Sequence, residues 1–167
     1  MSNDKNKAKT QRRFGTIDLA DIRAVSGLEL LRGIRDGLYP EPTMSRTLNF
    51  HMTELEEGIA EFKGYPDYSI YNPLGKVHGG YFATLLDSAL GCAVHTLCPA
   101  GYGSVTVEMK LNMVRPMSAD TGPVFARATV VHPGRQLATS EGRLVDENGK
   151  LYAHGTQTCS ILKLPAD

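Results

Sequence analysis

Apolar and polar residues alternate strictly over residues 105–113, where valine, methionine or leucine occupies every second position. A period of two predicts a β-strand. Less regular segments of the same kind predict three more strands, separated by turn sequences that contain glycine. These strands span residues 124–132, 136–145 and 151–164, with a tight turn at 146–149. Short turns between consecutive strands indicate an antiparallel sheet.

The first half of the chain begins with a different period. Leucine and isoleucine recur at intervals of three and four residues, which predicts a helix over residues 19–37. We expect Gly37 to end this helix, because glycine is common directly after a helix. Two short strands are predicted over residues 44–52 and 58–64, and the turn-forming composition of residues 65–76 predicts a loop.

A second helix is predicted over residues 79–96, and apolar or small residues cover most of its faces. A helix of this kind is usually buried. One buried helix followed by antiparallel strands predicts the α+β class, with the sheet wrapped around the helix. The valine and methionine stripe of residues 105–113 is expected to pack in the same core.

Composition adds a boundary near the start of the chain. The 167 residues include 18 Lys+Arg and 18 Asp+Glu, so the formal net charge is zero. Five of the basic residues lie within residues 1–13, where we predict a solvated terminus rather than a nucleic-acid or membrane arm. We divide the chain into a flexible basic tail over 1–15, a helical extension over 16–43 and the main domain over 44–164.

Charge and cysteine usage exclude several classes. A neutral chain is not typical of a dedicated nucleic-acid binder, and its apolar segments are too short for a confident membrane span. Cys92, Cys98 and Cys159 are odd in number and form no C-x-x-C pair, which predicts neither a disulfide framework nor a zinc site. We therefore expect a cytoplasmic protein without a bound metal.

Two features around the second helix point to chemistry. His78-Gly79-Gly80 opens the helix, and the two glycines leave its first backbone N–H groups accessible. These amides and the helix dipole favour a developing negative charge, as an oxyanion hole requires. Asp87 lies within the apolar helix, with no Lys or Arg three or four residues away. It is either a base or nucleophile in a cleft, or a carboxylate hydrogen-bonded at a subunit contact.

The residues around the start of the second helix resemble the motif of a known family. His-Gly-Gly is followed by Asp nine residues after the His, with Asn six residues before it. This motif resembles the hotdog-fold acyl-CoA thioesterases of the 4-hydroxybenzoyl-CoA thioesterase superfamily, most of all their PaaI-like subgroup. Supporting matches are Val105-Thr-Val-Glu-Met, Arg115-Pro116, Gly134-Arg135 and Asn148-Gly149.

The resemblance implies a hotdog fold and a set of catalytic residues. Asp87 matches the acidic residue that activates water or attacks the thioester carbonyl, and Gly79 matches the amide that polarises this carbonyl. His78 and Asn72 match residues that orient the carbonyl or the water. Thr106 matches a Ser or Thr that hydrogen-bonds near the nucleophile.

The same resemblance implies where the substrate binds. Gly80 lies beside the polarising amide, and Gly134 and Arg135 match a turn close to the CoA pyrophosphate and nucleotide. CoA enters as part of the substrate, so no separate cofactor is implied. The rival functions are a non-catalytic acyl-CoA-binding or regulatory module and a hotdog dehydratase.

Helix geometry gives an expectation about assembly. Gly79 and Asp87 are eight residues apart, which places their Cα atoms about 12 Å apart on one helix. Groups that act on one carbonyl must each come within about 3–3.5 Å of it. We therefore expect two antiparallel helices from two chains to share each site, so that a homodimer is the minimal active unit. The family resemblance extends this expectation to a homotetramer.

Overall fold

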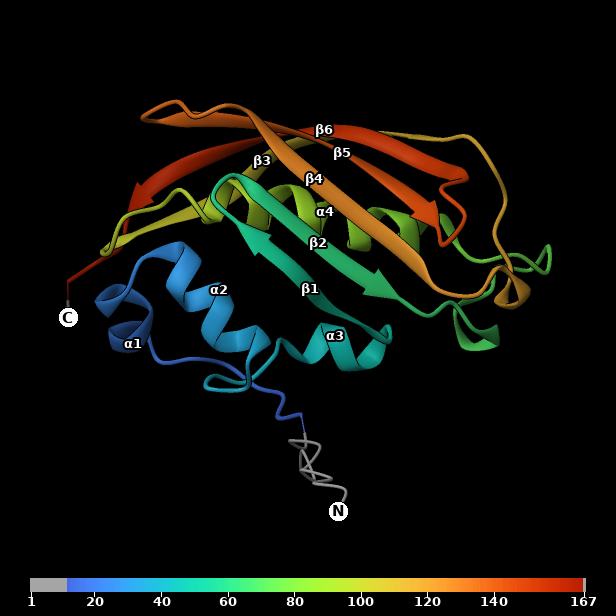
Figure 1. Ribbon diagram of the computed structural model, residues 1–167, viewed down its shortest axis with the longest axis horizontal. Coiled ribbons are helices and arrows are strands. Elements are labelled where there is room, and N and C mark those ends of the chain that lie inside the picture. The colour runs from blue at the N-terminus through green and yellow to red at the C-terminus, as the bar shows by residue number, and fades with distance from the viewer. Residues whose placement is uncertain (1–11, 167) are drawn as a thin grey trace, which may run out of the picture.

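The computed structural model describes residues 12–166, so most of the predicted basic tail lies outside the described residues. A six-stranded antiparallel sheet curves around the long helix α4 (Gly79–His95), as Figure 1 shows. The strand order is β1-β2-β4-β5-β6-β3. The strands are β1 (Phe50–Glu56), β2 (Ile59–Gly64), β3 (Tyr102–Met113), β4 (Val124–His132), β5 (Leu137–Asp146) and β6 (Leu151–Lys163). The predicted α+β class is confirmed.

Helix α4 buries one broad face against the sheet. Leu85, Leu86 and Leu90 have no exposed surface, and Tyr81 and Phe82 are also buried in the core. Burial of a leucine or phenylalanine side chain stabilises a fold by about 1.5–3 kcal/mol. The apolar residues of the second predicted helix therefore anchor it inside the sheet and fix its orientation.

The remaining face of α4 is only half-buried in the single chain. Five of its residues with small or polar side chains define what we call the open stripe: Thr84, Asp87, Ser88, Gly91 and Cys92. This stripe lies beside β3, because Thr106 of β3 donates a hydrogen bond to Asp87. Asp87 is thus half-buried, whereas the sequence placed it within a helix that was expected to be buried.

Strand β3 differs from the regular pattern of its sequence. A bulge between Thr106 and Glu108 shifts its register against β6, and a bulge reverses which side chains face the core. Val105 and Val107 are therefore 50% and 60% exposed, while Met109 packs against the core. The prediction that the whole stripe lies in the core is wrong for these valines and for Met113, which is also 50% exposed.

The helix predicted over residues 19–37 is divided into α1 (Leu19–Ala24) and α2 (Gly27–Arg35). Ser26 separates them, because its hydroxyl accepts from the Glu29 amide while the Glu29 carboxylate accepts from the Ser26 amide. This reciprocal capping box starts a new helix. Gly37 ends the helical segment as predicted, with a φ of 84°.

The strand predicted over residues 44–52 is wrong in its first part. Residues Thr43–Thr47 form the short helix α3, and β1 begins only at Phe50. β1 then continues to Glu56, so the turn to β2 is shorter than predicted. Gly58 makes this tight turn possible with a φ of 77°. Short 3₁₀ helices are η1 (Tyr68–Ile70) and η2 (Ala119–Thr121).

The N-terminal helices attach to the end of α4. The Gly27 amide donates to the Cys98 carbonyl at 2.9 Å, directly after α4 ends. A Cβ atom on Gly27 would overlap the His95 carbonyl oxygen. Residue 27 must therefore be glycine for α2 to approach the C-terminal end of α4 this closely.

Candidate active site

The N-terminus of α4 presents one free amide. His78 is the N-cap residue, and its Nδ1 accepts a hydrogen bond from the Gly80 amide at 2.8 Å. The Tyr81 amide donates to the His78 carbonyl. Among residues 12–166, no acceptor faces the Gly79 amide. The sequence predicted that both glycine amides are accessible, but Gly80 is engaged by His78, so Gly79 alone can bind an oxyanion.

His78 has a second consequence for this end of the helix. Because its Nδ1 accepts a hydrogen bond, the hydrogen of the neutral ring belongs on Nε2. The exposed ring can therefore donate from Nε2 next to the Gly79 amide. Met113, at the end of β3, covers the other side of Gly79, where a Cβ atom would lie 3.0 Å from its sulfur.

Asn72 lies in the loop before α4. Its side-chain oxygen accepts from the Leu74 and Lys76 amides at 3.0 and 3.2 Å. The neighbouring residues Tyr71 and Val77 pair in an isolated bridge, which brings the two ends of the loop together. The Asn72 oxygen thus shapes the loop, and its side-chain N–H groups have no hydrogen-bond partner among residues 12–166.

Asp87 is held by one of its two carboxylate oxygens. Oδ1 lies 3.1 Å from the Thr106 hydroxyl and 3.2 Å from the amide nitrogen of Gln157, in the orientation that satisfies both ends of that amide. Oδ2 has no hydrogen-bond partner within residues 12–166. A fixed carboxylate with one free oxygen is suited to accept a proton or to attack a carbonyl carbon.

Sequence reasoning missed Gln157. The signal that could have found it is strand parity, because Ala153, Gly155 and Cys159 at alternating positions of β6 are all buried. Gln157 shares that face and is 1% exposed. A glutamine on the buried face of a central strand must find hydrogen-bond partners, and here they lie at Asp87 and Thr106.

An open cavity of about 230 Å³ lies against Asp87. Cys92 and His95 line it from α4, and Ser104 and Cys159 line it from the sheet. Burial raises the pKa of Cys92 to about 12, with the Asp87 charge as the second cause. Burial also lowers the pKa of His95. The thiol is therefore protonated and the imidazole neutral near pH 7.

Comparison with known proteins identifies the family. The family model described as the thioesterase superfamily matches residues 74–153. The proofreading thioesterase EntH of Klebsiella pneumoniae is 31% identical over 110 residues, 66% of this chain and 79% of EntH. The chain belongs to the thioesterase superfamily. Its enzyme class is accordingly that of a hydrolase acting on thioesters.

Further relatives agree with the fold of this thioesterase superfamily member. The 1,4-dihydroxy-2-naphthoyl-CoA hydrolase of Listeria monocytogenes is 23% identical over 121 residues, 72% of this chain and 96% of that protein. The structure of PaaI from the phenylacetic acid degradation operon of E. coli is 20% identical, with a TM-score of 0.72 over 84% of this chain and 100% of that chain. The hotdog fold that the motif implied is confirmed.

Within the thioesterase chain, the predicted substrate-binding residues Gly134 and Arg135 lie away from the Asp87 cavity. Gly134 and Arg135 line a separate cavity of about 620 Å³ at the C-terminal end of α4, together with Val94 and Tyr102. None of the residues that line the Asp87 cavity also lines this one. Within one chain, the predicted CoA-binding turn and the predicted catalytic carboxylate are thus distinct sites.

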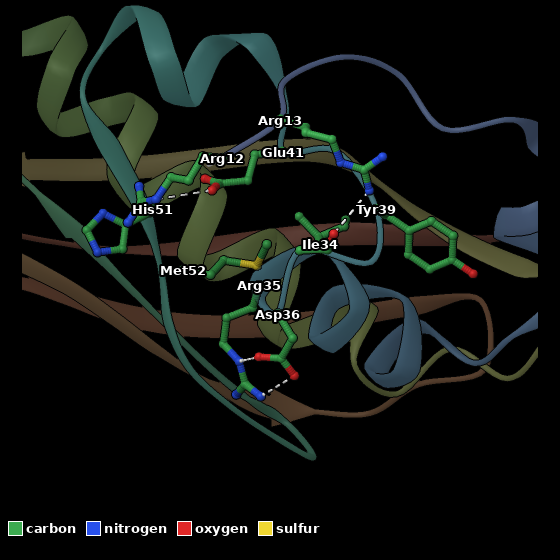
Figure 2. Close-up of a pocket in the computed structure, with 10 residues that line it drawn as sticks. Arg12, Arg13, Ile34, Arg35, Asp36, Tyr39, Glu41, His51 and Met52 are labelled. Atoms are coloured by element: carbon green, nitrogen blue, oxygen red, sulfur yellow. Dashed lines mark hydrogen bonds and ion pairs between the residues drawn. The ribbon is translucent and has the colours of Figure 1, made fainter. Parts of the chain in front are cut away.

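A further cavity of about 200 Å³ lies where the N-terminal segment meets β1. Figure 2 shows that two of its arginines face carboxylates: Arg12 faces Glu41, and Arg35 faces Asp36. Arg13 instead donates to the Gly37 and Leu38 carbonyl oxygens. Burial lowers the pKa of His51, at the wall of this cavity, to about 4. Both ion pairs lie within the N-terminal segment, and Arg32 of the same segment donates to the Leu55 carbonyl oxygen of β1.

Residues 12–166 of the thioesterase, which the structure describes, can be searched for metal ligands and for membrane-spanning helices. It contains no group of three or more His, Cys, Asp or Glu side chains that could hold a metal ion. None of the helices in the same range is long and apolar enough to cross a membrane. Cys92, Cys98 and Cys159 are all free thiols.

Proposed function

We propose that this thioesterase hydrolyses an acyl-CoA to a free carboxylic acid and CoA. The observation that carries the proposal is the state of Asp87, whose Oδ1 is fixed by Thr106 while its Oδ2 is free beside an open cavity. The hydrolase named for 1,4-dihydroxy-2-naphthoyl-CoA among the relatives supports CoA as the thiol component. The free thiols support a reducing compartment, and we propose a cytoplasmic enzyme.

Asp87 acts as the general base in the first of two routes. Its carboxylate takes a proton from water, and the oxygen of that water adds to the thioester carbonyl carbon. The tetrahedral intermediate then collapses, the C–S bond breaks, and the departing CoA thiolate receives the proton from Asp87. In the second route, the carboxylate itself attacks, CoA leaves, and water hydrolyses the resulting anhydride.

The two routes differ in the origin of an oxygen atom. A single turnover in ¹⁸O-labelled water puts the label into the acid product if Asp87 is a base. It puts the label into the Asp87 carboxylate if Asp87 is the nucleophile, provided that water attacks the aspartyl carbonyl of the anhydride. Mass spectrometry of the acid product and of the peptide that contains Asp87 distinguishes these outcomes.

The negative charge that develops on the carbonyl oxygen requires a donor. We assign this role to the Gly79 amide, which lies at the N-terminus of a 17-residue helix and has no acceptor among the described residues. The helix dipole adds to the effect of this single hydrogen bond. His78 Nε2 and the side-chain N–H groups of Asn72 are the neighbouring donors that we propose orient the carbonyl or the water.

We propose that the donor and the base of each site come from two chains. Eight residues of helix separate Gly79 and Asp87, which corresponds to about 12 Å. A symmetric dimer with antiparallel α4 helices would place Gly79 of one chain beside Asp87 of the other, in two equivalent sites. A dimer of such dimers would give the homotetramer implied by the family resemblance.

Two surfaces of the single chain support the proposal that a partner chain covers them. The open stripe of α4 is half-buried, whereas the apolar face of the same helix lies in the core. β3 is an edge strand of 12 residues. Its residues Val105 and Val107 are 50% and 60% exposed. Long edge strands with exposed apolar side chains favour pairing with another strand. We propose a second copy of this chain as the partner.

The test measures hydrolysis and binding in parallel. A panel of acetyl-CoA, hexanoyl-CoA, benzoyl-CoA and phenylacetyl-CoA is offered to the wild type, and the released thiol is measured. Asp87→Asn is expected to lose at least about 100-fold in rate while it retains binding of the best substrate. Equal rates of wild type and variant would contradict the mechanism. Binding of the panel without hydrolysis by the wild type would favour an acyl-CoA-binding module instead.

The dehydratase rival is tested with a different substrate. A dehydratase needs a base that removes a proton next to the carbonyl, whereas Asp87 is proposed to act on water or on the carbonyl carbon itself. Incubation with 3-hydroxybutanoyl-CoA followed by mass spectrometry separates loss of water from loss of CoA. We expect loss of CoA, and formation of crotonyl-CoA would favour the dehydratase.

A further inference from the structure

We propose that Gln157 is a positioning residue that holds the Asp87 carboxylate in its reactive orientation. This inference rests on the proposed function, because it assigns a partner to the proposed base. Gln157 is 1% exposed and lies on β6, paired with Met109 of β3 on one side and Ser140 of β5 on the other. It therefore acts from beneath α4 and does not touch the substrate.

The contacts of the Gln157 amide converge on the proposed base. Its nitrogen lies 3.2 Å from Asp87 Oδ1, and its oxygen lies 2.9 Å from the Thr106 hydroxyl and 3.3 Å from the Gly91 amide. In the opposite orientation the nitrogen would face the Thr106 hydroxyl and the Cys159 sulfur. Only the first orientation pairs each end of the amide with a group of the complementary kind.

Gly91 provides the space for this arrangement. A Cβ atom on residue 91 would lie 3.1 Å from the Gln157 amide, which is tighter than an ordinary van der Waals contact. Glycine inside a helix is destabilising relative to alanine. The close approach of the Gln157 amide gives a physical reason for a glycine inside α4.

The arrangement fixes Asp87 from the sheet. The donors to Oδ1 come from β6 and β3, whereas Asp87 itself belongs to α4. The Thr106 hydroxyl has one hydrogen, so it serves either Asp87 or Gln157 at a given moment. The Gln157 nitrogen supplies a donor to Asp87 in both cases. Its loss would let the carboxylate rotate, and misplacement of a reacting group by about 1 Å can reduce a rate 100-fold.

The test compares Gln157→Met with a matched control. Methionine has a similar length and shape but no amide. Ser140→Ala is the control, because Ser140 is also 1% exposed and donates from the same sheet to α4, at the Leu90 carbonyl, without contacting Asp87. With the best acyl-CoA of the panel, Gln157→Met is expected to lower kcat about 10- to 100-fold. Its KM should stay within about twofold, and Ser140→Ala should change neither.

A double-mutant cycle tests whether Gln157 acts through Asp87. In the Asp87→Asn background, Gln157→Met is expected to leave the residual rate unchanged within about twofold. If Gln157→Met does not fold, Gln157→Asn replaces it, since this variant keeps a polar amide but withdraws it from Asp87 by one methylene. A loss of kcat is expected for this variant as well.

The outcomes separate the two proposals. Wild-type kcat in the Gln157 variants, together with impaired hydrolysis in Asp87→Asn, overturns only the positioning role. A fall in kcat that Ser140→Ala matches at equal loss of thermal stability also overturns it. A wild-type rate in Asp87→Asn instead overturns the proposed function on which this role depends.

Discussion

Gly79 and Asp87 lie on one continuous helix, eight residues apart, with the free amide at its first residue and the half-buried carboxylate near its middle. A helix rises 1.5 Å per residue, so neither side-chain rotation nor a small shift joins them within one chain. Each is placed by a different feature. His78 caps the helix and leaves the Gly79 amide free, and Thr106 fixes Asp87 from the sheet.

The Gly79 amide can be removed without removing the helix. We predict that Gly79→Pro lowers kcat about 100-fold or more, because one oxyanion donor contributes on this scale. Proline is favoured at the first position of a helix, and the extended backbone of His78 suits a residue before proline. Circular dichroism should show an unchanged helix content.

Gly79→Ala is the matched control for this variant. It adds a Cβ atom near the flexible Met113 side chain but keeps the N–H group. We expect it to retain most of the activity. Equal losses in the alanine and proline variants would show that space, rather than the hydrogen bond, limits the reaction.

Gly27 is predicted to be essential for attachment of the N-terminal helices. A Cβ atom there would overlap the His95 carbonyl, so Gly27→Ala should lower the free energy of unfolding by about 1–3 kcal/mol. Gly15→Ala is the control, because its Cβ atom would meet only Pro40 at an ordinary 3.7 Å. Urea unfolding of both variants measures the difference, and similar values for the two would contradict this packing.

The stability of the protein is predicted to depend on pH through His51. Burial, together with the nearby Arg12 and Lys63 charges, lowers its pKa from 6.5 to about 4. The folded state therefore favours the neutral ring. This contribution to stability is complete above pH 6.5 and is lost as the pH falls towards about 4, because the unfolded chain takes up the proton first.

His51→Phe isolates this effect. Phenylalanine keeps a ring that can stack on Tyr65, as the imidazole does at 5.8 Å, but it does not titrate. Burial raises the pKa of Glu41, which acts in the opposite direction but is common to both proteins. The free energy of unfolding should fall less between pH 7 and pH 4.5 in the variant than in the wild type. Parallel pH profiles would contradict the role of His51.

Periodicity predicted the parts of the fold that carry long, regular patterns. Helix α4 and the strands after it follow from apolar spacing, and the Asn148-Gly149 turn follows from local backbone preference, with a φ of 77° at Gly149. The break before α2 depends on one reciprocal pair of hydrogen bonds at Ser26. Such a local pair leaves the apolar spacing on either side unchanged, so spacing alone predicted a single helix.

The candidate site shows a similar division. Gly79 and Asp87 belong to one motif of neighbouring residues, so both could be predicted from the sequence. Gln157 contacts Asp87 only because β6 and α4 pack together, and no local pattern records that contact. The bulge after Thr106 interrupts pairing with β6 although the alternation of the sequence continues without a break. The exposed valines could therefore not be predicted from alternation.

The central claim is that each site joins Asp87 of one chain to Gly79 of another, and mixed dimers test it most directly. Asp87→Asn and Gly79→Pro proteins are each expected to be nearly inactive. In a mixed dimer, one site combines the intact Asp87 with the intact Gly79, and the other site carries both substitutions.

The measurement is the hydrolysis rate after the two variants are unfolded together in equal amounts and refolded. Random pairing makes half of the dimers mixed, with one intact site in each, so roughly a quarter of the wild-type activity should return. Activity no greater than that of the separately refolded variants, in a mixture shown to contain mixed dimers, would contradict the shared site.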